Sequence, residues 1–133
     1  IDLVQWATKP AWSALSKHLG DDRAQRVQQE LLADDLDFFL WQNSQRHVKV
    51  RLINGRTVLN QVKESNLFEL IEDQPLEIET THGSQRCQTY IGRGYSNELV
   101  LGWSTNIQRL YGGNDIKLRA AQKIGNWVAK SVR

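Results

Sequence analysis

The spacing of apolar residues changes near His47, and this change restricts the chain to folds that keep helices and strands in separate stretches. Upstream, apolar residues recur every three or four positions, as on one face of a helix: Ala24, Val27 and Leu31. Downstream, apolar residues recur at every second position, as on one face of a strand: Val48, Val50 and Leu52. Helices followed by a run of strands are typical of the α+β class, which we expect here.

The first third of the chain carries helix boundary signals. Pro10 and Gly20 flank a short stretch as the opening proline and the closing glycine of a helix. Asp21 then caps a second helix, which is expected to end near Leu32. A third, shorter helical segment is expected over residues 36–41.

Asn54-Gly55 is the strongest hairpin signal in the chain. It separates the alternating stretch that ends in Leu52 from a second one over residues 57–63, so we expect the two to pair as a hairpin. Further strands are expected in four later segments: residues 67–72, 76–81, 86–91 and 98–103. Five or six short strands joined by tight turns are typical of a small, strongly bent sheet or barrel.

Gly112-Gly113 precedes a last, amphipathic helix that is expected to reach about Val132. At about 100° per residue, one side of this helix is apolar: Ile116, Ala120, Ile124, Trp127 and Val128. A neighbouring stripe is basic: Arg119, Lys123, Lys130 and Arg133. Because Asp115 is the only acid in the helix, a nucleic acid or an acidic surface is a candidate partner for this stripe.

A chain of 133 residues can bury one core without disulfides or metal, so one domain is expected over residues 1–133. Its parts are a helical region over residues 1–44, a barrel over residues 47–103 and a helix over residues 113–132. The single Cys87 and the absence of a secretory pattern favour a cytoplasmic location. No apolar run approaches the ~20 residues that span a bilayer, so no membrane association is expected.

Four features follow one another without a gap over residues 48–70. They are an alternating strand that ends in Leu52, the Asn54-Gly55 turn, Gln61-Val62, and Phe68 after a short polar bend. Together with a helix just upstream, these features resemble the first motif of the Sm-like RNA-binding proteins, in particular the Hfq-related ones, over about residues 34–70. Thr80-Thr81-His82 stands where that family has Tyr-Lys-His between its last two strands.

The resemblance implies an Sm-like β-barrel that binds single-stranded RNA without catalysing a reaction and without a cofactor. DNA is the alternative nucleic acid. In that family the position of Phe68 stacks on a base, and strands pair edge to edge between subunits, which implies a homo-oligomer. From the residues alone, a core aromatic is the favoured interpretation of Phe68, because an aromatic residue in a strand is more often buried.

Other candidate contacts come from charge and turn position. His82 lies in a His-Gly-Ser turn, where an imidazole can meet a base or a phosphate, although a solvated turn histidine is the plainer interpretation. Lys49, Arg51 and Arg56 lie in the expected first hairpin, where a basic strand face can follow a phosphate backbone. Most such faces are merely solvated.

Two competing functions stay open. One is a protein-interaction or regulatory accessory module, in which the basic helix and the tryptophans contact another protein. The other is a metal-dependent nuclease that uses the acidic clusters at residues 34–37 and 69–73 to hold Mg²⁺. A strand with Glu-x-Lys spacing and phosphate-binding or dinucleotide loops are absent, and the three histidines are too dispersed for zinc, so no metal is expected.

Overall fold

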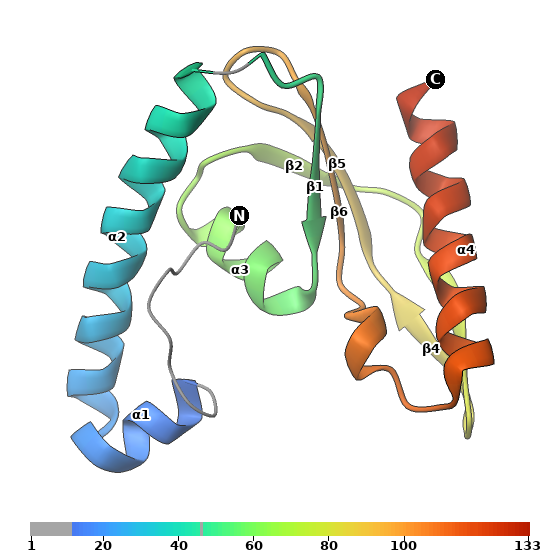
Figure 1. Ribbon diagram of the computed structural model, residues 1–133, viewed down its shortest axis with the longest axis horizontal. Coiled ribbons are helices and arrows are strands. Elements are labelled where there is room, and N and C mark those ends of the chain that lie inside the picture. Colours follow the sequence, from blue (N-terminus) through green and yellow to red (C-terminus); the bar gives the residue numbers. More distant parts are fainter. Residues whose placement is uncertain (1–11, 46) are drawn as a thin grey trace. The chain divides into compact units, whose positions relative to one another are not determined.

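The structure is a computed structural model that describes residues 12–45 and 47–133 (Figure 1). It divides into two compact units, residues 1–47 and 48–133, with the boundary where the apolar spacing changes. The expected α+β class is confirmed: helices make up the described part of the first unit, and the second contains both helices and strands. The expectation of one domain over residues 1–133 stays a prediction.

The first unit contains α1 (Trp12–Leu19) and α2 (Asp21–Gln45), joined at Gly20. The end of the first helix at Gly20 is confirmed. The expected break near Leu32 is wrong, because α2 continues through this point as one helix of 25 residues. Its sequence contains neither glycine nor proline, so nothing in the backbone interrupts it.

In the second unit, β1 (Val50–Asn54) leads into a helix, α3 (Arg56–Glu64), and not into a return strand. The expected Asn54-Gly55 hairpin is therefore wrong. Gly55, at φ 95°, is the N-cap of α3, and its carbonyl accepts a hydrogen bond from the Leu59 N–H at 3.1 Å. Leu59 and Val62 are both buried. Residues three apart share a face of a helix but lie on opposite faces of a strand, so the helix buries both on one face.

Four strands form a mixed sheet in the order β1-β6-β5-β2 (Figure 1). The other members are β2 (Glu69–Glu72), β5 (Thr89–Arg93) and β6 (Leu99–Trp103). β1 runs parallel to β6, and the remaining pairs are antiparallel. Because β1 and β2 occupy the two outer positions, the sheet is open, and the barrel expected over residues 47–103 is not confirmed.

A separate hairpin pairs β3 (Leu76–Thr80) with β4 (Gly83–Cys87). The expected strand over residues 86–91 is instead divided at Gln88 between β4 and β5. The Gln88 N–H donates to the Ser104 hydroxyl, and the Gln88 carbonyl accepts from the Ser104 N–H, both at 2.9 Å. These two bonds hold the chain where it passes from one sheet to the other.

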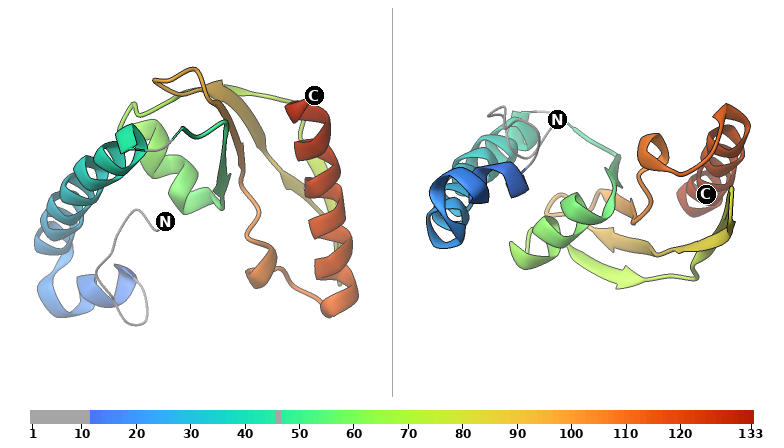
Figure 2. Two further views of the ribbon diagram at one scale, coloured as in Figure 1. Left: turned by 45° about the horizontal axis from the view of Figure 1, so that its top comes forward. Right: turned by 90° about the horizontal axis from the view of Figure 1, so that it is seen from below.

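The last helix, α4 (Asn114–Val132), packs on β3 and β6, with a short 3₁₀ helix, η1 (Ile107–Arg109), beside it (Figure 2). Its expected apolar side is confirmed, since Ala120, Ile124 and Trp127 are buried against Ile78 and Leu101. Alternate residues of β6 face opposite sides, so Leu101 meets the core under α4 whereas Gly102 lies against Leu59 of α3.

Candidate nucleic-acid interface

Phe68 lies in the core of the second unit. Its side chain is 7% exposed, and the Arg51 guanidinium lies 5.7 Å from the centre of its ring. The position fits the alternative interpretation, a core aromatic. In this conformation the ring offers no open face to a base.

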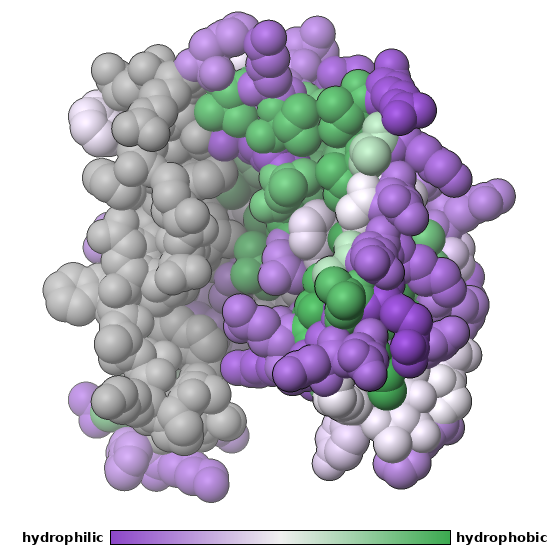
Figure 3. All heavy atoms as spheres, turned by 45° about the vertical axis from the view of Figure 1, so that its right-hand side comes forward, coloured by the Kyte–Doolittle hydropathy of each residue, from purple (hydrophilic) through white to green (hydrophobic). Residues whose placement is uncertain are grey.

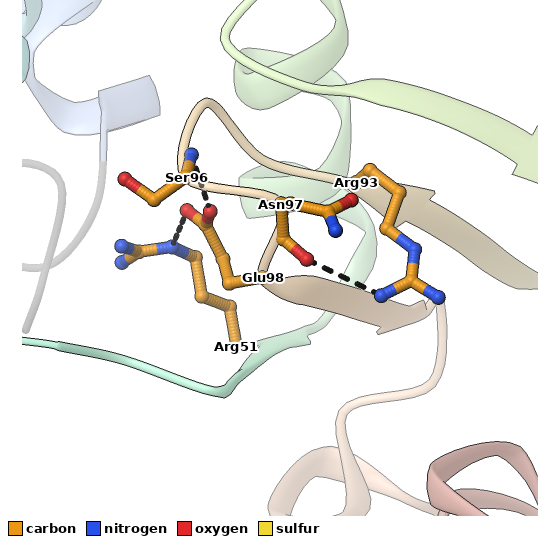
Figure 4. Close-up of polar contacts among 5 residues, drawn as sticks. All are labelled: Arg51, Arg93, Ser96, Asn97 and Glu98. Atoms are coloured by element: carbon orange, nitrogen blue, oxygen red, sulfur yellow. Dashed lines mark hydrogen bonds and ion pairs between the residues drawn. The ribbon is translucent and has the colours of Figure 1, made fainter.

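Arg51 is also turned inward. Its Nε lies 2.7 Å from Oε1 of Glu98, and the two side chains are only 11% and 3% exposed (Figure 4). The strand face expected to carry Arg51 toward a phosphate backbone thus uses this cation for an internal ion pair. Lys49 and Arg56, by contrast, are exposed.

Glu98 organises the turn between β5 and β6, residues 94–98, which we call the β5–β6 tip. Its second carboxylate oxygen accepts a hydrogen bond from the Ser96 N–H at 2.9 Å, and its backbone carbonyl accepts one from the Gly94 N–H at 2.9 Å. A Cβ on Gly94 would collide with this carboxylate, so a larger residue there would displace it. The Arg93 guanidinium donates to the Asn97 carbonyl at 3.3 Å (Figure 4). The buried Glu98 carboxylate therefore connects the tip to Arg51 of β1.

The Glu98 carboxyl is held in its charged form. Burial by itself raises the pKa of Glu98, but hydrogen bonds from the Arg51 side chain and from the Ser96 and Glu98 N–H groups, with the charge of Arg51, outweigh this effect. The resulting pKa lies below its ordinary value of 4.5. The ion pair is therefore fully formed at neutral pH.

Tyr95 is the exposed aromatic residue of the tip, at 74%. Exposed cations occur on the segments next to the tip: Arg93 ends β5, and the Lys49 backbone carbonyl accepts a hydrogen bond from the Leu99 N–H at 3.0 Å. An exposed ring can stack on a base while nearby cations contact phosphates. The sequence analysis singled out neither Tyr95 nor Arg93, although an aromatic inside a Gly-Tyr-Ser-Asn turn was a usable signal.

The basic stripe of α4 is partly engaged within the fold. Arg119 pairs with Glu79 of β3 at 2.9 Å, and the Lys123 ammonium donates to the Glu77 carbonyl at 2.6 Å. Both cations thus help attach α4 to β3. Lys130 is exposed and forms no ion pair with any described residue.

His82 is exposed in the turn between β3 and β4 and contacts a second aromatic. Its ring centre lies 6.3 Å from that of Tyr111, with the planes tilted by 45°. Tyr111 is 77% exposed. Sequence analysis identified His82 but not Tyr111, because 29 residues separate the two.

Among the described residues, no group of three or more His, Cys, Asp or Glu side chains is placed to hold a metal ion. The helices of residues 12–45 and 47–133 include none that is long and apolar enough to cross a bilayer. No family model, curated protein or solved structure matches the chain. The relationship to the Sm-like family therefore stays a prediction.

Proposed function

We propose that this protein is a non-enzymatic nucleic-acid-binding protein that binds single-stranded RNA through the β5–β6 tip. The observation that carries this proposal is the exposed Tyr95 ring on a turn held by the buried Arg51–Glu98 ion pair. A ring on a preorganised turn loses little conformational entropy when a base stacks on it. Stacking accepts any base, so the proposal names a class of ligand and not a sequence.

The charge distribution supports the same proposal. Residues 48–133 contain twelve Lys and Arg and eight Asp and Glu, a net charge of +4. Residues 1–47 contain five Lys and Arg and seven Asp and Glu, a net charge of −2. The excess of cations thus lies in the unit that carries the β5–β6 tip, where it favours the approach of a polyanion.

Titration of a labelled oligouridylate with Tyr95→Ala and Tyr95→Phe tests the role of the ring. Tyr95→Ala should weaken binding by ~1–3 kcal/mol without changing its salt dependence, and Tyr95→Phe should bind like the wild type, because stacking needs the ring and not a charge. Leu118→Ala, an exposed position on α4, is the matched control. Equal affinity of Tyr95→Ala and the wild type would overturn the proposal.

The double variant Lys49→Ala/Arg93→Ala tests the phosphate contacts in the same titration. Affinity should fall for all sequences alike, and the slope of log affinity against log salt should decrease by ~0.7 for each phosphate that the variant no longer neutralises. Repeating the series with a deoxyuridine strand separates RNA from DNA, since only RNA offers a 2′-hydroxyl.

A protein-interaction module is the second candidate function, and exposed apolar side chains favour it. Leu52 on β1 is 56% exposed and Ile71 on β2 is 67% exposed, and the strand register places both on the same face of the sheet. Apolar residues also gather on the face shown in Figure 3 (green). A binding partner held by this face should bind with little dependence on salt, unlike a nucleic acid.

Self-association is the simplest form of this second function. β1 and β2 are the outer strands of the sheet, and among the described strands neither has a second neighbour. Light scattering should then give a mass that exceeds the 15.3 kDa of one chain and rises with concentration. A constant mass of 15.3 kDa would exclude the oligomer and leave the RNA proposal intact.

A further inference from the structure

We infer that the His82–Tyr111 pair is a second base-binding contact, so that the preferred ligand is a single strand long enough to reach both this pair and Tyr95. The inference rests on the proposed function and adds a length requirement to it. Three observations carry it: the exposure of both rings, the cations near them, and their position relative to the β5–β6 tip.

The two rings come from different parts of the chain and form one exposed aromatic surface. His82 lies in the β3–β4 turn and Tyr111 lies just before α4, with their ring centres 6.3 Å apart. Tyr111 is 77% exposed, although an aromatic ring of this size gains free energy when it is buried. Two adjacent exposed rings can hold a base by stacking, whichever base it is.

Two cations belong to the segments on either side of Tyr111. Arg109 is exposed two residues before Tyr111, and it forms no ion pair with a described residue. On the first turn of α4, the Lys117 ammonium donates to the Gln108 carbonyl of η1 at 3.1 Å, which places this charge beside the same loop. The pair therefore combines stacking surface with phosphate-binding charge, as does the β5–β6 tip.

The two aromatic surfaces lie at opposite ends of one compact unit. In Figure 1 the β5–β6 tip lies at the end of the sheet where α4 finishes, and the β3–β4 turn lies at the end where α4 begins. The 19 residues of α4 span roughly 28 Å between these ends. A short oligonucleotide reaches one surface only, whereas a longer one reaches both and gains from the high effective concentration of the second contact.

The test is a length series of oligouridylates from about 4 to about 16 nucleotides, the range that small single-strand-binding domains cover. Wild-type affinity should rise steeply once a strand can reach both surfaces. Tyr111→Ala should remove that rise and weaken binding of the longest strand at least about 5-fold, the lower limit for one stacked base. Tyr111→Phe, which keeps the ring, should behave as the wild type. Melting temperatures show that each variant is folded.

The outcomes separate this inference from the proposed function. If Tyr95→Ala weakens binding while Tyr111→Ala binds the longest strand like the wild type, the second contact is refuted and the proposed function stands. The length requirement is also refuted if Tyr111→Ala weakens short and long strands equally. If neither substitution changes the affinity of any strand, both proposals fail.

Discussion

Arginine ion pairs connect both the β5–β6 tip and helix α4 to neighbouring strands, but the two pairs lie in different environments. At the tip, Arg51 is paired with Glu98 away from water, and the pair holds the turn that exposes Tyr95. On α4, Arg119 meets Glu79 on the surface, where both side chains are more than half exposed. The Arg51–Glu98 pair fixes the conformation of the turn, whereas the Arg119–Glu79 pair is screened by solvent and contributes little to stability.

Burial, and not charge, therefore separates a structural cation from one available to a ligand. Arg51 and Phe68 were both candidates for contact with nucleic acid, and both are enclosed in the fold. Lys49, Arg93 and Tyr95 are instead exposed, and they are the residues of the proposed RNA contact. The following substitutions test this division.

The largest effect is expected for Phe68→Ala. Truncation of a buried phenylalanine should lower the free energy of unfolding by ~3–5 kcal/mol, because it removes packing and leaves a cavity. Tyr95→Ala, at an exposed position, should change it by less than about 0.5 kcal/mol. Urea unfolding of the two variants measures the contrast. If both variants lost the same free energy of unfolding, Phe68 would not be a core residue.

Arg51→Ala should also be strongly destabilising. It leaves the Glu98 carboxylate buried without its partner, and breaking a buried pair in this way costs ~3–5 kcal/mol. The double variant Arg51→Met/Glu98→Leu should recover much of this stability, since no buried charge remains. Urea unfolding again gives the values. A double variant no more stable than Arg51→Ala would contradict the buried-charge explanation.

A smaller effect on stability is expected when the pH is lowered. Because the folded-state pKa of Glu98 lies below its ordinary value of 4.5, its contribution to stability is present above that value and is lost as the pH falls through the folded-state pKa. Melting temperatures measured from about pH 6 to about pH 3 should show a steeper decline for the wild type than for Glu98→Gln, which has no carboxyl to protonate. Parallel declines would mean that other carboxyls control acid stability.

Arg119→Ala should have the smallest effect. The exposed pair with Glu79 should contribute about 0–1 kcal/mol to stability, and less at high salt. Urea unfolding at low and high salt measures this contribution, with Lys130→Ala as the control, since Lys130 pairs with none of the acidic residues that the structure describes. A destabilisation as large as that of Arg51→Ala would remove the distinction between the two regions.

The local elements that sequence analysis predicted correctly are those whose pattern admits one interpretation. Gly20 ends α1, and the three-to-four spacing in α4 identifies its buried side, because both signals act within a single helix. The strand expected over residues 98–103 appears as β6. The residues of α3 were assigned wrongly: the Asn54-Gly55 turn favoured a strand, whereas in the structure Leu59 and Val62 are buried together on one face of a helix.

By itself, the sequence determined the α+β class, the change of structure near His47 and the apolar side of α4, because these depend on residues a few positions apart. The tertiary structure decided the parallel pairing of β1 with β6, the Arg51–Glu98 ion pair across 47 residues and the meeting of His82 with Tyr111. Such contacts form only when distant segments pack together. The desolvation that turns Arg51 from a surface cation into a buried one is a property of that packing and of no local pattern.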